Sequence, residues 1–398
     1  MNKLDVGYRG EAVGTLAIVR GGLYFEYAPS FLAGGHELSP LALPLAPGIL
    51  SRDGGTTLRL PGLFEDSLPD TWGLRVMDDW FRRQGTPPHE IGPLMRLSFV
   101  GRRAFGALEY APARHAEAGR GSLDTIYAAT ARMEEGARTD LALLADVGTS
   151  AGGARPKAAL WFDAPMRSLA HDFDAAHTEA WLVKFDTTVG RCFGRIEHAY
   201  AAMARAAGLE MPETRLLLTE HAAGPRAHFA VRRFDRAGAE RIHYHSLAGL
   251  MHQLGSDLDY QTLLRVTRRL TRDHAEVLKA FRRAVFNVLA GNRDDHGKNH
   301  GFLYDPAERQ WRLSPAFDLT FVGAGQLRER GLAVMGERAQ AGVPELERLA
   351  AGEGIDRRDC RTILDEVRAA VTRWPEFAAE AGVPERNSAE IGAALMVK

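Results

Sequence analysis

The amino-acid sequence predicts a two-lobed α+β protein. Near the N-terminus, short apolar runs separated by glycine ("KLDVGY", "AVGTLAIV" and "GGLYFEY") are typical of small strands joined by tight turns. From about residue 148, strands are predicted around one Ala-rich helix at 195–209, and a block of helices follows them. Strands around a single helix, followed by a helical block, indicate two lobes that differ in secondary structure.

Each element has its own local signal. A helix is predicted over 68–85, because apolar side chains recur every four residues from Leu68 to Trp80, and Pro69 and Asp70 suit a first helical turn. The stretch 115–148 is polar and then helical, and we place a domain boundary inside it. The remaining predicted strands are 105–113, 157–162, 179–187, 212–220 and 227–236, and the remaining helices are 247–254, 260–270, 275–292 and 361–374.

Composition narrows the class of protein. The 398 residues are 45% hydrophobic and 25% charged, which is ordinary for a soluble globular protein. A net charge of -1 argues against a polycation that binds nucleic acid nonspecifically, although a local basic patch stays open. Cys192 and Cys360 have no CxxC spacing, so neither a disulfide framework nor a zinc site is suggested. Without an apolar leader or an apolar run of about 18 residues, we expect a cytoplasmic protein that does not enter membranes.

The segment "GNRDDHGKNHG" (291–301) brings many polar groups to the end of an apolar helix. Asp294 and Asn299 have the D-x-x-x-x-N spacing of a phosphotransferase loop, with the carboxylate as base and the carboxamide as metal ligand. A solvated turn is the alternative, since Asn, Asp and Gly are favoured in turns. Asp318 in "LSPAFDL", nineteen residues after Asn299, favours the phosphotransferase, because Mg²⁺ needs oxygen ligands from two sides.

Two upstream features fit a nucleotide site. Lys184 lies in the apolar strand "AWLVKFD", where its ammonium must find a partner or an aqueous cleft, unless it is a lysine that snorkels from an edge strand. Glu197 in the next helix could orient it. The loop "VGTSAGGARPK" (147–157) has small residues whose N–H groups could approach a phosphate, but it matches no standard glycine motif and could equally be a turn. Thr149 and Ser150 could accept phosphate.

In this order, the segments resemble the HipA family of serine/threonine kinases, the toxins of bacterial type II toxin-antitoxin modules. The resemblance runs essentially end to end. It rests on "DVGTSAGGARPKAAL", "WLVKFD", "VRRFDR", "GNRDDHGKNHGFLYD" and "LSPAFDL", and on the N-terminal "VGTLAIVRGGLYFEYAPSFL" and "LPGLFEDSLPDTWGLRVM". It implies a protein-kinase-like fold with an extra N-terminal β-rich subdomain (1–140), a kinase N-lobe (141–236) and a helical C-lobe (237–398).

The resemblance also implies residue roles. Asp294 would be the catalytic base, Lys298 would steady the transferred phosphate, and Asn299 and Asp318 would bind Mg²⁺. ATP would contact Ser150, Gly152, Gly153, Ala154, Lys157 and Lys184, the hinge residues Arg232, Phe234 and Asp235, and the metal ligands Asn299 and Asp318. Phosphorylation of Ser150 by the kinase itself would be an off-switch, with Thr149 as the other candidate acceptor. We expect His296 to brace the loop, and Asp295 and His300 to be bystanders.

Two positions depart from the family pattern. Arg232 replaces a hinge glutamate, and "GGARPK" replaces the "AGAQ-x-K" form of the phosphate loop. We therefore expect adenine contacts through the hinge backbone, and a phosphate-loop switch that differs from the family's.

Three functions follow from these interpretations. The first is ATP- and Mg²⁺-dependent phosphorylation of a protein, in the family including aminoacyl-tRNA synthetases, which would arrest growth. The second is a corepressor that docks on a helix-turn-helix antitoxin like HipB and reaches operator DNA through it. The third is a metal-dependent nuclease built on the Asp/His loop, in which Lys184 and the glycine-rich loop have no obvious place.

Overall fold

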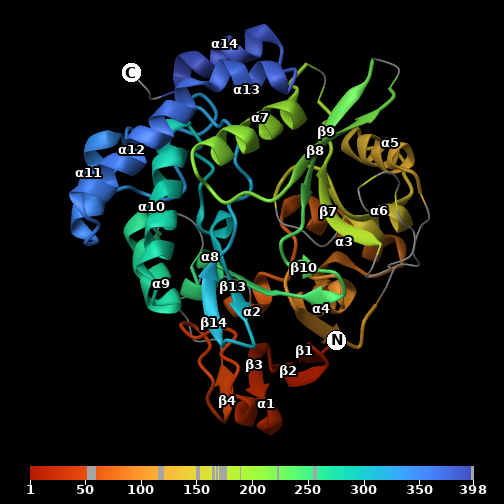
Figure 1. Cartoon of the computed structure of the whole chain (residues 1–398). Helices are drawn as coiled ribbons and strands as arrows, with labels where there is room; N and C mark the ends of the chain where they lie inside the picture. The colour runs from red at the N-terminus through yellow and green to blue at the C-terminus, as the bar shows by residue number, and fades with distance from the viewer. Residues whose placement is uncertain are drawn as a thin grey trace. The chain divides into compact units, whose positions relative to one another are not determined.

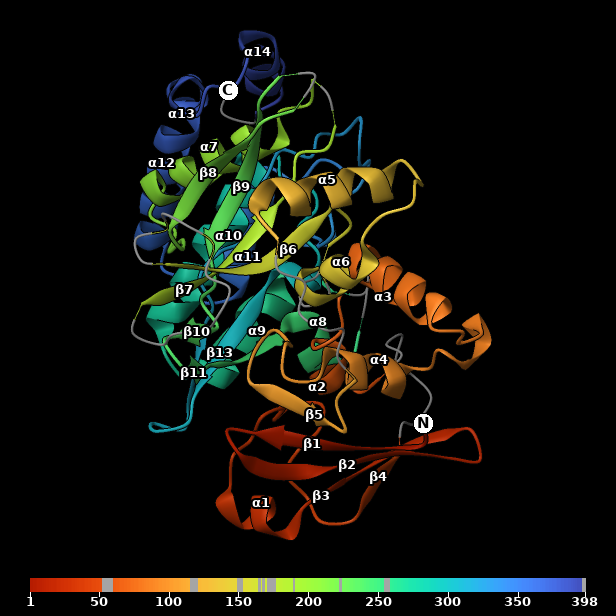
Figure 2. The same ribbon diagram turned by 90° about the vertical axis from the view of Figure 1, so that its right-hand side faces the viewer.

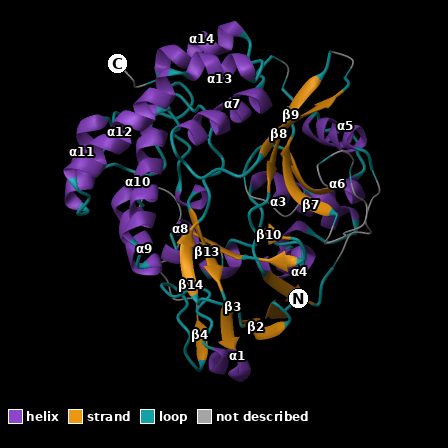
Figure 3. Ribbon diagram, viewed as in Figure 1, coloured by secondary structure: helices purple, strands orange, loops and turns teal. Residues whose placement is uncertain are grey.

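The protein is described by a computed structural model covering residues 1–51, 60–114, 121–148, 153–163, 166, 169, 177–188, 190–221, 224–253 and 258–395 (Figure 1). Helices and strands are mixed along the chain (Figure 3), which confirms the predicted α+β class. Two compact units form: the first comprises 1–189, 217–245 and 249–252, and the second 190–216, 246–248 and 253–398. The predicted division at 140 and 236 is finer than these units and stays a prediction. Among the helices described, none has the length and apolarity needed to span a bilayer.

The first unit begins with a five-stranded antiparallel sheet in the order β4-β3-β2-β1-β5, whose first strands are drawn in red with α1 beside them in Figure 2. Its side chains alternate as a half-buried sheet requires, so Leu4 and Val6 are buried while Lys3 and Asp5 face water. The predicted glycine turns are present, because Gly10 and Gly21 both have positive φ in two-residue hairpin loops. The strands are β1 (Lys3–Tyr8), β2 (Glu11–Val19), β3 (Gly22–Tyr27), β4 (Ile49–Ser51) and β5 (Leu108–Ala111).

Short helices follow this sheet in the first unit. The helix predicted over 68–85 forms as α3, and it buries Trp72, Val76 and Phe81, whereas Trp80 is only half-buried. Helix α6 packs against α3, α5 and the strand that follows it. The helices are α1 (Pro29–Gly34), α2 (Gly62–Glu65), α3 (Thr71–Arg83), the 3₁₀ turn η1 (Pro88–Glu90), α4 (Pro93–Val100), α5 (Leu123–Glu134) and α6 (Leu141–Val147).

A second sheet in the order β6-β7-β9-β8 carries the predicted lysine strand. In its antiparallel register Lys157 is opposite Lys184, and Trp181 is opposite Arg232. Strand β8 passes from the second unit into the first between Leu216 and Leu217. The strands are β6 (Lys157–Asp163), β7 (Thr178–Lys184), β8 (Thr214–Thr219) and β9 (Arg226–Arg232), followed by the short β10 (Arg236–Ala237), β11 (Glu240–Arg241) and β12 (His243–Ser246).

The second unit is built around helix α10, which packs against α9 and α12 (Figure 1). Its predicted apolar face is confirmed, because Val277, Phe281, Val285 and Leu289 are all fully buried. The elements are α7 (Phe193–Ala206), α8 (Leu247–Met251, shared with the first unit), α9 (Tyr260–Thr271), α10 (His274–Leu289), η2 (Gly297–Asn299), β13 (Gly301–Asp305), β14 (Gln310–Leu313), α11 (Val343–Gly352), α12 (Arg357–Thr372), α13 (Trp374–Glu380) and α14 (Glu385–Ala394).

Candidate active site

The polar segment 291–301 starts where helix α10 ends. Ala290 is the C-cap, and Gly291 follows it in the left-handed conformation with φ 65°, which turns the chain out of the helix. The carbonyl of Gly291 accepts a hydrogen bond from the Val322 amide at 3.1 Å. The stretch just after Asp318 therefore lies beside the start of the polar loop, within the second unit.

The loop presents Asp294 to solvent. Its side chain is 50% exposed, and its Oδ1 lies 3.7 Å from Nε2 of His296. The side-chain amide of Asn299 donates to the backbone carbonyl of Asp294 at 2.7 Å, which fixes the Asn299 carboxamide over the loop. An accessible carboxylate suits a general base, and the Asn299 oxygen Oδ1 is the atom that could bind a hard cation. Lys298 is half-buried between them in the sequence.

The expectation that Asp295 and His300 are bystanders is wrong, whereas the bracing role of His296 stays a prediction. His296, predicted as the brace, lies half-exposed beside Asp294, whereas the supposed bystanders Asp295 and His300 are buried. Nε2 of His300 lies 3.3 Å from the carbonyl of Asp295, and burial lowers the pKa of His300 well below its usual range, so the neutral ring donates there. Buried polar groups in a loop are structural when the backbone and neighbouring side chains satisfy them.

Asp295 is held by residues that sequence reasoning missed. Its carboxylate accepts hydrogen bonds from the Tyr260 hydroxyl at 2.6 Å and from the Arg330 guanidinium at 2.8 Å. The Gly331 amide donates to it at 2.8 Å. Tyr260 and Arg330 each stand 35 positions away in the sequence, so no local motif could reveal them.

Asp318, the predicted second metal ligand, has an unusual backbone. Its φ is 55°, in a region that residues other than glycine seldom adopt and that recurs at functional sites. Its segment contacts the polar loop through a parallel bridge between Asn292 and Val322. Amide and carboxylate oxygens from Asn299 and Asp318 would suit Mg²⁺. Within the described ranges, no group of three or more His, Cys, Asp or Glu could hold a metal ion.

In the first unit, two lysines face each other on neighbouring strands. Lys157 and Lys184 are directly opposite in the β6–β7 pair and are only 4% and 7% exposed. The Lys184 ammonium lies 5.7 Å from the centre of the Phe229 ring. Like charges placed opposite each other in a sheet repel, and the repulsion grows when they are buried. Two lysines on one face of a strand pair can both contact one anion that carries several negative charges.

The end of the glycine-rich loop approaches this pair. The φ of Gly153 is 105°, which favours glycine, and a Cβ atom there would lie 2.1 Å from Nζ of Lys157, so a larger residue would push the end of this lysine aside. The Gly153 amide donates to Asp70, the N-cap residue of α3, at 2.8 Å. Ala154 follows in the same described stretch, whereas Thr149, Ser150 and Gly152 lie outside the described residues. The expected partner of Lys184, Glu197, is buried on α7 in the second unit, and their pairing stays a prediction.

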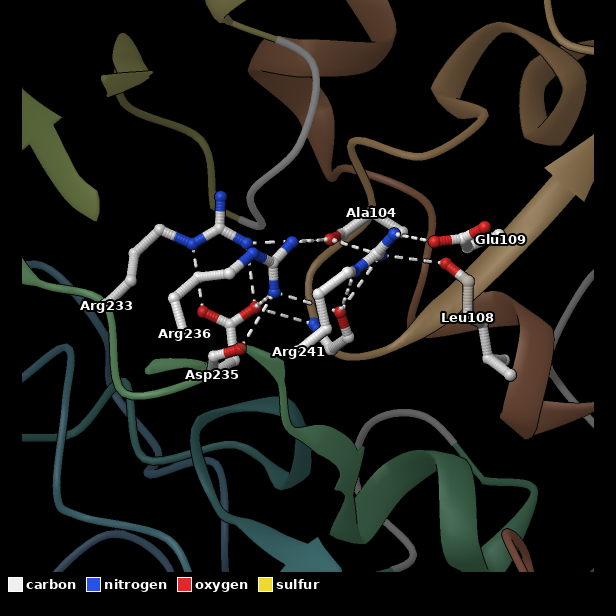
Figure 4. Close-up of polar contacts among 8 residues, drawn as sticks. Ala104, Leu108, Glu109, Arg233, Asp235, Arg236 and Arg241 are labelled. Atoms are coloured by element: carbon white, nitrogen blue, oxygen red, sulfur yellow. Dashed lines mark hydrogen bonds and ion pairs between the residues drawn. The ribbon is translucent and has the colours of Figure 1, made fainter. Parts of the chain in front are cut away.

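The predicted hinge is tied into a buried arginine cluster (Figure 4). Asp235 is fully buried, and its carboxylate accepts from Arg233 at 2.7 and 2.9 Å, from Arg236 at 2.6 Å and from the Gly106 amide at 2.7 Å. Burial alone raises the pKa of Asp235, but Arg233 and Arg236 lower it to about 2. Arg236 and Arg241 also donate to backbone carbonyls of 104–108.

This cluster changes the interpretation of the hinge residues. We expected Asp235 near a ribose, but its carboxylate faces arginines inside the first unit and therefore has a structural role. Arg232 is half-exposed and pairs with Glu179 at 3.1 Å on the neighbouring strand. The ring of Phe234 packs edge-on against Phe105, with 5.3 Å between ring centres.

A further buried arrangement was not predicted. Oγ of Ser39 lies 2.9 Å from Nε2 of His245, and Nδ1 of His245 lies 2.6 Å from Oδ2 of Asp66. These contacts have the geometry of a hydrolase triad. Ser39 and His245 are both fully buried, so no substrate reaches the hydroxyl, and the three side chains act as a structural tie.

Known proteins show similarity along most of the chain. The profile of the HipA-like C-terminal domain matches residues 149–374, and that of the HipA N-terminal domain matches residues 4–111. A solved structure described as the Shewanella oneidensis toxin-antitoxin system of HipA, HipB and operator DNA aligns with a TM-score of 0.72 and 18% identity. That alignment covers 98% of this chain and 94% of the other, which shows a shared fold.

Two curated relatives are described as kinases. "Putative kinase Y4dM" of Sinorhizobium fredii is 26% identical over 49% of this chain. A Haemophilus influenzae protein of the same description is 29% identical over 32% of this chain. The matched stretches span 50% and 40% of these relatives' own lengths.

Proposed function

The chain belongs to the HipA family, and from this premise we propose that it is an ATP- and Mg²⁺-dependent serine/threonine protein kinase acting in the cytoplasm. The observation that carries the proposal is the pair of buried lysines, Lys157 and Lys184, facing each other across β6 and β7. Two lysines on one face of a strand pair would attract an oligophosphate more strongly than a singly charged ligand. Gly153, at the end of the proposed phosphate loop, lies close to Nζ of Lys157.

The residues present fit a nucleotide with its metal ion. Lys157, Lys184 and the backbone amides of Gly153 and Ala154 would bind the phosphates, and the loop residues Ser150 and Gly152 complete the proposed contacts. Oxygens of Asn299 and Asp318 would hold Mg²⁺, which neutralises charge on the phosphates when bound. The hinge backbone at Arg232 and Phe234 would meet the adenine.

The chemistry asks little covalent work of the protein. The hydroxyl oxygen of the acceptor forms a bond to the γ-phosphorus as the bond to ADP breaks, and Asp294 accepts the hydroxyl proton. The exposed position of Asp294 leaves room for a protein substrate. Lys298, four residues further along, would steady the transferred phosphoryl group. Holding the reactants in line is the main source of acceleration.

We further propose that the kinase phosphorylates its own loop at Ser150, with Thr149 as the alternative acceptor, and that this modification switches the enzyme off. A doubly charged phosphate on this loop would place negative charge near Lys157 and compete with the nucleotide. The protein substrate would be an aminoacyl-tRNA synthetase, whose phosphorylation would arrest growth.

Incubation of the purified chain with radiolabelled ATP and Mg²⁺ tests the kinase. We expect label on the wild type, none on Asp294→Asn, and loss of autophosphorylation in Ser150→Ala. The matched control is Asp365→Asn, because Asp365 is an exposed carboxylate on α12. Absence of both nucleotide binding and phosphate transfer in the wild type would contradict the proposal, and DNA cleavage that depends on Asp294 would favour the nuclease instead.

A second candidate function is a corepressor. The Shewanella oneidensis structure with this fold is described as a complex with HipB and operator DNA. We propose a helix-turn-helix antitoxin as partner, with operator DNA bound through it. If this is the main function, Asp294→Asn will still form the antitoxin–DNA complex in a gel-shift assay with wild-type affinity. If neither the wild type nor Asp294→Asn binds the helix-turn-helix protein encoded by a neighbouring gene, the corepressor function is excluded.

A further inference from the structure

We propose that Asp295 is a positioning residue, whose buried carboxylate fastens the segment 328–332 to the polar loop and thereby fixes where Asp294 stands. This inference rests on the kinase function proposed above and names a device that sets its catalytic geometry. The contact joins two stretches of the second unit that are 35 positions apart.

Asp294 is anchored on both sides by the same segment. On one side, the Arg293 guanidinium donates to the carbonyl of Arg328 at 2.7 Å, and the Arg293 carbonyl accepts from the Gly331 amide at 3.0 Å. On the other side, the Asp295 carboxylate accepts from the same Gly331 amide at 2.8 Å. The backbone of Asp294, which lies between these two anchors, is therefore held in place, although the Asp294 side chain is half-exposed.

The segment presses directly on the loop backbone at Gly331. A Cβ atom there would lie 2.4 Å from the amide nitrogen of His296 and 2.8 Å from the carbonyl carbon of Asp295. Both of these neighbours are backbone atoms, so any side chain larger than hydrogen would push the segment and the loop apart. The close approach is therefore possible only because position 331 is glycine.

Asp295 also connects the loop to two helices. The Tyr260 hydroxyl on α9 donates to Asp295 at 2.6 Å and accepts from the Asn287 amide on α10 at 3.0 Å. Asn287 in turn accepts from the Asn292 side chain at 3.1 Å. The loop is thus held at Asn292 and at Asp295 by buried groups that belong to rigid helices, which is how a catalytic side chain is kept in place.

The charge of Asp295 is essential to this arrangement. Arg330 is 4% exposed, and its guanidinium lies 2.8 Å from the carboxylate. Asparagine at 295 keeps only one acceptor oxygen and no charge, so Arg330 loses its counter-charge and either the guanidinium or the amides of 331–332 face an NH₂ group, which favours a shifted loop. Nucleotide binding should weaken less than turnover, because Lys157 and Lys184 belong to the first unit and only Asn299 among the proposed ATP and Mg²⁺ contacts belongs to the loop.

Steady-state kinetics of the full chain test the proposal. Asp295→Asn should lower kcat roughly 100-fold, since small misplacements of a reacting group have effects of that order, while KM for ATP changes far less than kcat. Hydrogen exchange of the amides in 291–300 should become faster in this variant. Asp365→Asn, an exposed carboxylate, is the matched control and should change neither quantity.

A double variant separates positioning from simple loss of stability. Asp295→Asn combined with Arg330→Met removes both buried charges, so it should recover the unfolding midpoint but not kcat. Recovery of kcat by the double variant, or wild-type kcat in folded Asp295→Asn, would overturn the proposal. A different result is a wild type that transfers no phosphate although its amides in 291–300 are protected from hydrogen exchange. That result rejects the kinase function itself, and this inference with it.

Discussion

Gly291 decides where helix α10 ends and the polar loop begins. Its φ is 65°, so an alanine at this position would have a strained backbone, and the added Cβ would lie 3.2 Å from the Phe321 ring. We expect Gly291→Ala to lower the free energy of unfolding by about 1 kcal/mol, measured by urea titration. Gly352→Ala at the end of α11 is the control, because a Cβ there meets nothing within 4 Å. Equal effects of the two substitutions would show that the left-handed turn is not required.

His228 makes stability depend on pH. Nδ1 accepts from the Asp186 amide at 3.0 Å, so Nε2 carries the proton and donates to Thr219 at 2.8 Å. Burial, assisted by Arg226, lowers the pKa of His228 from its usual 6.5 to about 4. As pH falls from 6.5 to 4, His228 is protonated in the unfolded chain but stays neutral in the folded protein. The free energy of unfolding therefore falls by at most about 3 kcal/mol.

The test compares wild type and His228→Gln by urea unfolding at pH 7.0, 5.5 and 4.5, pH values chosen to span roughly the interval between the two pKa values. The wild type should lose more stability on acidification than the variant. Other histidines with lowered pKa values, His243 and His300, are present in both proteins and cancel in the difference. Parallel pH profiles would show that His228 titrates normally.

At the scale of elements, strands β6 and β7 show what local patterns can and cannot predict. The apolar run around Lys184 predicted a strand correctly, since alternation and β-branched residues are local signals. The position of Lys157 opposite it depends on the register of two strands separated by 164–177, which no local pattern encodes. For the same reason, the sequence could not show that Tyr260 and Arg330 bind Asp295 in the polar loop.

Binding of the nucleotide should depend on both lysines of this strand pair. With ATP and Mg²⁺ at about 100 times Kd, the wild type should gain about 2.7 kcal/mol of stability, seen as a higher thermal midpoint. Lys157→Met and Lys184→Met should each lose most of this gain. Lys279→Met is the control, because Lys279 is a half-exposed lysine on α10. If ATP and Mg²⁺ raise the thermal midpoint of Lys157→Met and of Lys184→Met as much as that of the wild type, then the two lysines do not bind the phosphates.

At the scale of the whole molecule, the arginine cluster joins parts of the chain that the family profiles treat separately. Ala104, Gly106, Leu108 and Glu109 fall in the N-terminal match, whereas Arg233 to Arg241 fall in the C-terminal one. The Gly106 amide and Asp235 are 129 positions apart, yet they share one hydrogen bond. The sequence predicted the strands and helices on both sides, but "RRFDR" alone could not show that its aspartate turns inward.

Replacing Asp235 should weaken the first unit as a whole. Asp235→Asn leaves Arg233 and Arg236 buried without their counter-charge, at a cost of about 3 kcal/mol, which urea unfolding monitored by tryptophan fluorescence would measure. Glu240→Gln, a change at an exposed carboxylate nearby, should have little effect. If Asp235→Asn is as stable as the wild type but binds ATP weakly, then the original ribose contact is the better assignment.

The buried Ser39–His245–Asp66 tie has a consequence for chemical profiling. Fluorophosphonate probes label serine hydrolases because an activated hydroxyl is open to solvent. In this fold the Ser39 hydroxyl is bonded to His245 only while Ser39 is buried. Solvent reaches Ser39 only when the first unit opens, and this opening separates Ser39 from His245. Activation and access therefore exclude each other, and a search for hydrolases by triad geometry would select a serine that such a probe never modifies.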